Sequence, residues 1–210
     1  LLALKALSDI NRNGAYANIT LQGYISKYNL SDLDRRFFTE LVYGVVRRMN
    51  YLDAIIVHFA KRPVKKLSSM VVEILRLGIY QIIYMDKVPD SAAVNESVKL
   101  AKKLTRGLSG FVNAILRSVI REQDTIGIED LAKNDVEIIS FIYNIPLWLI
   151  NLWIGERGRE QTEDLCAWFN QQPILTARIN TILIDIPQCL SLLKEQGWDV
   201  SQDSTYDDII

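Results

Sequence analysis

Apolar residues recur at spacings of three and four through most of the first half of the chain. The clearest run extends from Phe37 to Phe59, and its spacing is that of one amphipathic helix. We expect this helix to be continuous or gently bent and to end at about His58. Ser31 precedes it with Asp34 three residues later, which resembles a capping box.

Other segments of the first half carry the same helical period. The segment from Leu67 to Met85 is apolar on most sides, which predicts a helix in the middle of a bundle. Nothing in this half has the alternating pattern of a strand. The remaining helices are expected at Leu1–Ile10, Ile19–Tyr28, Ala92–Leu104 and Phe111–Arg121.

The pattern changes after Thr125. Shorter helices with acidic surfaces are expected first, and Pro173 then precedes a run of β-branched residues from Leu175 to Ile184 that favours a strand. Together with the segments that follow, this strand predicts the beginning of a small α/β module. The expected elements are helices at Glu129–Tyr143, Leu147–Gly155, Arg159–Phe169 and Pro187–Gln196, the last closed by Gly197, and a second strand at Trp198–Val200.

One uncharged stretch, Ile138–Gly155, approaches the length of a membrane span. Pro146 lacks the N–H that a continuous helix needs, and no basic cluster directly flanks the stretch. We therefore expect two segments of a soluble protein that meet at Asn144–Pro146, and no membrane partner.

The charge of the chain is divided between its two halves. The 210 residues carry a net charge of −1, but residues 1–125 have 19 Lys and Arg against 11 Asp and Glu. Residues 126–210 have 5 against 14. This asymmetry predicts two domains, 1–125 and 126–210, of which the basic one faces a polyanion. Since the chain starts at Leu1 and stops soon after an acidic stretch, both ends look cut from something longer.

The basic residues of the first domain fall into clusters. A single pair of basic residues is usually a solvated helix face, but several clusters on one helical unit favour a phosphate-contacting surface. The candidate RNA-binding residues are Arg35, Arg36, Arg47, Arg48, Lys61, Lys65, Lys66, Lys102, Lys103 and Arg106. The last three precede Gly107 and the start of a helix, where free N–H groups could hold a phosphate, although a structural turn explains the glycines equally well.

The sequence offers no credible catalytic or metal site. His58 is the only histidine, and a packing role near a helix end suits it better than catalysis. Cys166 and Cys189 are isolated, without the spacing of a zinc site, and are expected to be reduced structural residues of a cytoplasmic protein.

Several motifs of the first domain resemble the NusB-like domain, which occurs alone as a transcription antitermination factor and fused to RNA methyltransferases. Two are upstream, RFFTELVYGVVRR at 36–48 and LRLGIYQ at 75–81, and two are late, PDSAAVNESVKLAK at 89–102 and GFVNAILR at 110–117. The polar residues of the late motifs, Asn95, Glu96 and Asn113, are expected to satisfy backbone groups at helix contacts. We expect core positions for Tyr43, Tyr80, Phe111 and Val112.

The second domain resembles the linking subdomain of the Sun-type 16S ribosomal RNA cytosine-5 methyltransferases. The resemblance rests on Trp148 and Trp153, on NQQPILTARINT at 170–181 and on LLKEQG at 192–197. It implies a mainly α fold: a NusB-like bundle, additional helices, and the start of a small α/β subdomain.

The resemblance also implies a function. The chain would be an RNA-binding, non-catalytic fragment that recognises 16S ribosomal RNA. The missing catalytic domain would bind S-adenosylmethionine and use a cysteine pair to attack C6 of cytosine, so Cys166 and Cys189 have no such role and the fragment itself holds no cofactor. The alternative is a stand-alone antitermination or protein-interaction module, in which the bundle binds a protein partner. The sequence indicates no particular oligomeric state.

Overall fold

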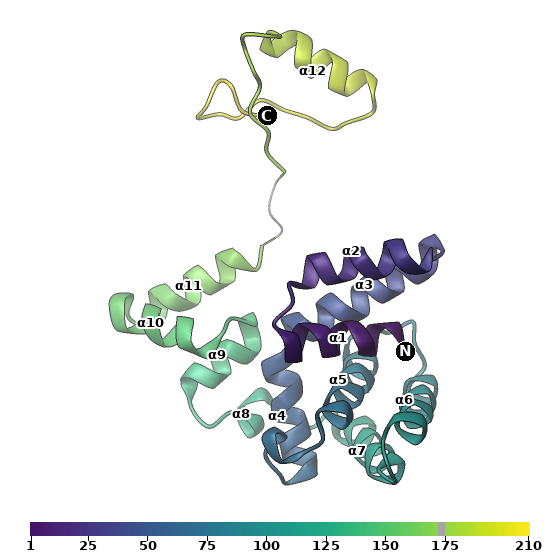
Figure 1. The fold of residues 1–210 in the computed structure, drawn as a ribbon. Helices are drawn as coiled ribbons and strands as arrows, with labels where there is room; N and C mark the ends of the chain where they lie inside the picture. The colour runs from purple at the N-terminus through teal and green to yellow at the C-terminus, as the bar shows by residue number, and fades with distance from the viewer. Residues whose placement is uncertain (172–174) are drawn as a thin grey trace. The chain divides into compact units, whose positions relative to one another are not determined.

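A computed structural model describes residues 1–171 and 175–210 of the chain. Its contacts divide the chain into two compact units, Leu1–Trp168 and Phe169–Ile210, and each is described here by itself. The first unit is helical along its length (Figure 1). Its elements are α1 (Leu2–Asn13), α2 (Ala17–Tyr28), α3 (Asp32–Arg47), α4 (Met49–Ala60), the 3-10 turn η1 (Val64–Lys66), α5 (Ser69–Tyr84), α6 (Asp90–Leu104), α7 (Ser109–Glu122), α8 (Ile128–Leu131), α9 (Asp135–Tyr143), α10 (Leu147–Arg157) and α11 (Arg159–Phe169).

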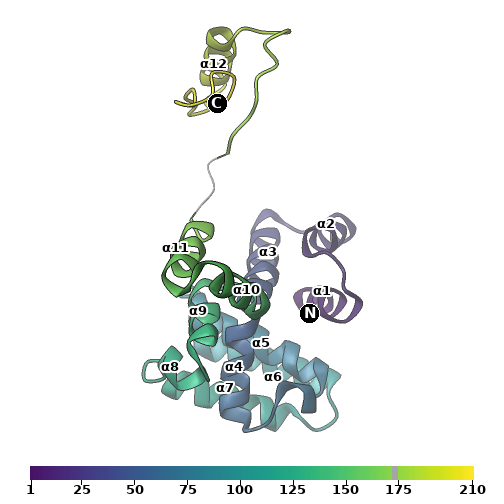
Figure 2. The ribbon, with the colours of Figure 1, turned by 90° about the vertical axis from the view of Figure 1, so that its left-hand side faces the viewer.

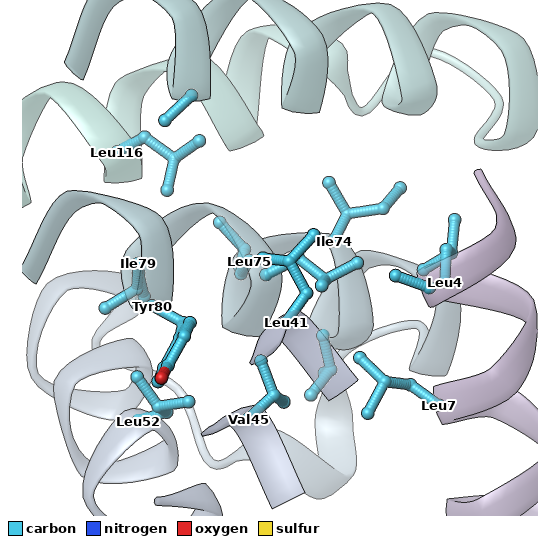
Figure 3. Close-up of a cluster of buried hydrophobic side chains, with 14 of the residues drawn as sticks. Leu4, Leu7, Leu41, Val45, Leu52, Ile74, Leu75, Ile79, Tyr80 and Leu116 are labelled. Atoms are coloured by element: carbon cyan, nitrogen blue, oxygen red, sulfur yellow. The ribbon is translucent and has the colours of Figure 1, made fainter. Parts of the chain in front are cut away.

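Helix α5 is the central helix of the bundle, as its apolar sequence predicts. It contacts α1, α3, α4, α6 and α7, so it meets neighbours on nearly every side. Side chains of α5 such as Ile74 and Ile79 pack among Leu4 of α1, Val45 of α3 and Leu116 of α7 (Figure 3). Burying each such side chain stabilises the fold by about 1.5 to 3 kcal/mol.

The prediction of one helix from Phe37 to Phe59 is wrong, because the chain breaks at Arg48. The backbone of Arg48 has φ −101° and ψ 16°, although its N–H still bonds the carbonyl of Gly44 at 3.1 Å. Helix α3 packs against α1, α2 and α5, whereas α4 packs against α5, α7 and α9. The apolar stripe therefore continues in the sequence while its two halves require different partners. The expected cap is confirmed, since Ser31 Oγ accepts the N–H of Asp34 at 3.2 Å.

A buried ion cluster joins three helices of the bundle. Arg76 of α5 donates to both carboxylate oxygens of Asp53 at 2.7 Å and to Glu73 Oε1 at 2.8 Å. Asn11 of α1 donates to the same Glu73 oxygen at 2.9 Å, while Glu73 Oε2 is buried without a hydrogen-bond partner. Burial raises the pKa of Glu73, against the opposing effect of Arg76. This cluster fixes α1 and α4 to the central helix.

Helices α8 to α11 extend the first unit beside α4, and α8 and α9 lie next to it in both views (Figures 1 and 2). The predicted helix at 129–143 is divided into α8 and α9, because Asn134 caps α9 by accepting the N–H of Glu137 at 3.0 Å. Helix α9 ends where Asn144 adopts the left-handed conformation, with φ 57°. A small core forms here around Ile139 and Ile150.

The uncharged stretch Ile138–Gly155 contains a sharp bend. Helices α9 and α10 are bent by 116° relative to each other, as expected for two segments that meet at Asn144–Pro146. Among the described residues no single helix is long and apolar enough to cross a membrane, and this bent pair meets the length and composition criteria only when its two helices are taken together.

The second unit contains α12 (Ile186–Glu195), which confirms the predicted short helix closed by Gly197. The predicted strand from Leu175 to Ile184 is wrong. Only residues 177–179 pair, in antiparallel fashion with 208–210, and the chain turns at Asn180, whose side chain accepts the N–H of Ile182 at 3.2 Å. Residues 198–200 form no strand either. Pro173 lies outside the described residues.

Candidate nucleic-acid interface

The predicted basic residues occupy separate places on the bundle. Arg47 and Arg48 lie at the junction of α3 and α4. The twelve residues of α4 separate this junction from Lys61, and Lys65 and Lys66 follow in η1. Helix α4 is about 18 Å long at 1.5 Å per residue. The junction and the far end of α4 are therefore separate basic surfaces of the bundle.

At the start of α3, Arg35 is already engaged by an acid. Its guanidinium lies 3.0 Å from Asp32, and both side chains are exposed, as is that of Arg36. The first turn of α3 also contains Asp34, so this end of the helix is locally balanced in charge. Arg35 and Arg36 are thus weaker candidates than the arginines at the other end of α3.

The third predicted cluster lies between α6 and α7. Lys102 and Lys103 are exposed in the last turn of α6, and Arg106 is exposed in the turn that Gly107 makes with φ 73°. Helix α7 begins at Ser109, and no N-cap side chain accepts a hydrogen bond from its first backbone N–H groups.

At the junction of α3 and α4, the structure brings two predicted arginines together with three tyrosines. They line a cavity of 270 Å³, which we call the arginine–tyrosine pocket. Its walls come from residues 40–48, around the end of α3, and from Tyr80 and Tyr84 of α5, which lie more than thirty positions later in the sequence. The lining residues are Glu40, Tyr43, Gly44, Arg47, Arg48, Tyr80 and Tyr84.

Contacts between the side chains hold the arginine–tyrosine pocket in shape. The guanidinium of Arg48 lies over the ring of Tyr84, 4.1 Å from its centroid, which is a cation–π arrangement. The hydroxyl of Tyr80 donates to Glu40 Oε1 at 2.5 Å, and the rings of Tyr80 and Tyr84 are 5.3 Å apart. Arg47 is exposed at the rim. The pocket therefore combines a positioned cation, an accessible cation and aromatic rings.

Tyr80 and Tyr84 of the pocket remain protonated at neutral pH. Burial raises the pKa of Tyr80, and its hydrogen bond to Glu40 raises it further. Burial also raises the pKa of Tyr84, which the nearby guanidinium of Arg48 opposes. Both rings are thus neutral, and their hydroxyl groups can act as hydrogen-bond donors.

Gly44 is required by the close approach of α3 and α5. A Cβ atom at this position would lie 2.0 Å from Cζ of Tyr80, a distance that no pair of non-bonded carbon atoms tolerates. The absence of a side chain here lets the Tyr80 ring lie directly against α3. The glycine of the VYGVVRR motif is thereby explained by packing.

The expected core positions are only partly confirmed. Tyr80 and Val112 are buried, and Phe111 is partly buried against the core, but Tyr43 is 39% exposed and lines the pocket. The neighbours Leu41, Val42 and Val45 take the buried face of α3, which places Tyr43 at its edge. The spacing of these residues was the signal that could have identified Tyr43 as a surface residue.

The surroundings of Cys166 and His58 suit structural roles. Cys166 is buried beside Ile139 and Ile150, and burial raises the pKa of its thiol, which makes it a poor nucleophile. The ring of His58 packs edge-on against Phe59 at 5.0 Å. Within residues 1–171 and 175–210, no group of three or more His, Cys, Asp or Glu side chains is placed to hold a metal ion.

Two family models match different regions of the chain. The model of the NusB family matches residues 1–121, which is more than half of the chain. The chain belongs to the NusB family. Beyond this NusB region, residues 145–210 match a second model, described as the ferredoxin-like domain of Methyltr_RsmF/B-like proteins.

Similar proteins extend the comparison over both regions. A Synechocystis protein named probable ribosomal RNA small subunit methyltransferase B is 44% identical over 92% of this chain and 44% of its own length. A Bacillus subtilis protein of the same name is 33% identical over the whole chain and 46% of its own length. The chain thus spans less than half the length of these relatives.

A solved structure supports the fold of the NusB region. The structure of NusB from T. maritima has a TM-score of 0.54 over 58% of this chain and 87% of that protein, at 21% sequence identity. The mainly α, NusB-like fold expected from the sequence is confirmed.

Proposed function

We propose that this chain is the RNA-recognition part of an S-adenosylmethionine-dependent methyltransferase that modifies C5 of a cytosine in 16S ribosomal RNA in the cytoplasm. In this proposal residues 1–125 hold the RNA and residues 126–210 link them to a catalytic domain. The names of the Synechocystis and Bacillus relatives support the reaction, and the arginine–tyrosine pocket supports the RNA contact. That pocket is the observation on which the proposal depends.

The chemistry of the pocket suits a single-stranded nucleotide. Arg47 is exposed and can pair with a phosphate, while the partly exposed ring of Tyr43 offers a face for a base. The Arg48 guanidinium is already held against Tyr84, so little side-chain freedom is lost when it meets a ligand. Glu40, bonded to Tyr80, favours a ligand whose phosphate lies on the arginine side of the pocket.

Residues 1–171 and 175–210 offer no site that fits S-adenosylmethionine. The described residues include no glycine-rich turn between a parallel strand and a helix, which is the usual site of a nucleotide-type cofactor. We therefore assign no chemical step to these residues, and their proposed role is to bind and position RNA. The match of residues 145–210 to a methyltransferase domain favours this proposal over a stand-alone antitermination module.

Filter binding of 16S ribosomal RNA at several salt concentrations tests the proposal. We expect Arg47→Glu with Arg48→Glu to weaken binding and to flatten the plot of log affinity against log salt by about 1.4 to 1.8, since each lost phosphate contact contributes about 0.7 to 0.9. A matched control, Arg121→Glu with Lys133→Glu, changes the net charge equally at exposed positions outside the pocket.

The control separates a local contact from a general effect of charge. We expect it to retain most of the affinity and slope of the unchanged chain, while circular dichroism remains the same for all three proteins. Equal RNA affinity for the unchanged chain and the pocket variant would contradict the proposal. Equal losses in the pocket variant and the control would also contradict it, because net charge alone would then explain the binding.

A further inference from the structure

A second cavity lies between α6 and α7, away from the residues of the arginine–tyrosine pocket. Its volume is 390 Å³, and we call it the α6–α7 groove. It is formed by the late sequence motifs, whose polar residues the function proposed above does not use. The lining residues are Asp90, Ser91, Val94, Asn95, Val98, Asn113, Arg117 and Ile120.

The polar residues of the groove do not have the architectural role expected for them. Asn95 and Glu96 are exposed, and the side chain of Asn95 forms no hydrogen bond with the part of the chain that the structure describes. Asn113 is partly exposed, and its Oδ1 accepts only from Arg117 Nε, at 3.2 Å. Since these amides satisfy no backbone group at a helix contact, their hydrogen-bonding capacity is available to a ligand.

The groove matches the dimensions and chemistry of an extended peptide. From Asp90 to Val98 the α6 side is about 12 Å long at 1.5 Å per residue, which accommodates about three to four extended residues. A primary amide such as that of Asn95 carries both a donor and an acceptor and can therefore pair with a peptide unit. Val94 and Ile120 provide apolar surface for an aliphatic side chain.

The charge of the groove indicates which peptide it would bind. Because only Arg117 Nε is engaged, its two terminal nitrogens remain able to form a paired hydrogen bond with a carboxylate. Asp90 at the start of α6 disfavours a phosphate chain, which has a charge on every unit, more strongly than a peptide with a single carboxylate. We propose that the α6–α7 groove binds an extended segment of a protein partner in which an acidic residue adjoins an aliphatic one.

Selection of random heptapeptides displayed on phage tests this proposal with the full chain as bait. The library is selected on the unchanged chain and depleted on Arg117→Ala. We expect the enriched peptides to carry Asp or Glu beside Val, Leu or Ile, and a synthetic version to bind Arg117→Ala at least about tenfold more weakly. Arg121→Ala, an exposed arginine of the same helix outside the groove, should bind the peptide like the unchanged chain.

Nuclear magnetic resonance then locates the bound peptide. We expect the side-chain amide signals of Asn95 and Asn113 to shift on titration, and Asn95→Asp, which keeps the shape but adds a negative charge, to weaken binding. Failure to enrich any peptide that prefers the unchanged chain to Arg117→Ala would overturn the proposal. So would enrichment of basic peptides, or shifts of the same amide signals by an oligouridylate RNA that displaces the peptide.

Discussion

Replacing Arg76 by methionine should show how much the buried ion cluster contributes to the free energy of unfolding. The change removes the partner of Asp53 and of Glu73, whose side chains are 28% and 5% exposed, while keeping a side chain of similar length in the core. Breaking a buried ion pair by removing one partner destabilises a protein by about 3 to 5 kcal/mol. We expect a loss in this range at pH 7.

The loss should be smaller in acid, because Glu73 can then be neutralised. Protonating a carboxyl group with the ordinary pKa of 4.5 requires about 1.36 kcal/mol per pH unit above that value, which is about 3.4 kcal/mol at pH 7 and about 0.7 kcal/mol at pH 5. These values are the upper limits of the penalty that a charged Glu73 without Arg76 can impose. The destabilisation caused by Arg76→Met should therefore fall by about 2 kcal/mol between pH 7 and pH 5.

Urea unfolding followed by circular dichroism at 222 nm measures this loss, because eleven of the twelve described α-helices begin in the first unit. Arg121→Met, at an exposed ion pair with Glu122, is the matched control and should change stability by less than about 0.5 kcal/mol. A loss below about 1 kcal/mol for Arg76→Met at pH 7, or the same loss at both pH values, would refute the reasoning.

Glu73 should also give the unchanged protein a distinctive pH dependence. Its pKa is raised in the folded state, so the folded chain binds more protons than the unfolded chain between about pH 4.5 and the raised pKa. The contribution of Glu73 to stability therefore falls as pH rises through this window. Glu73→Gln should remove that fall, which unfolding curves at a series of pH values would measure, and an unchanged pH profile would contradict the assignment.

Two further predictions concern packing and thiol chemistry. Gly44→Ala should destabilise the fold by about 2 to 4 kcal/mol, because its Cβ must displace Tyr80, whereas Gly23→Ala, with nothing within 4 Å of its Cβ, should be neutral or stabilising in thermal unfolding. Cys189 should react with a maleimide well before Cys166, which is buried and has a raised thiol pKa; equal reaction rates measured by mass spectrometry would disprove this difference.

Local spacing was enough to predict most helices, but it did not reveal which residues meet across the bundle. The apolar run of α5 identified the central helix, since a helix buried on all sides has few polar positions. The break at Arg48 could not be read from spacing, because the apolar period continues through it. The contact between Arg48 and Tyr84 joins different helices and leaves no local pattern.

Surface residues were misjudged where their motif resembled that of a known domain. Ala93, Val94, Ser97 and Ala101 form the buried stripe of α6, and Asn95 lies off that stripe. The helical period alone would therefore have placed Asn95 at the surface. The short pairing in the second unit was missed for another reason, since β-branched residues favour a strand but the turn at Asn180 ends it.

The position of Arg48 has a mechanical consequence. One residue forms the joint between two helices with its backbone and holds an aromatic ring with its side chain. A ligand that draws the guanidinium away from Tyr84 would act on the point about which α3 and α4 change direction. Spin labels on those two helices would then register occupancy as a change in separation.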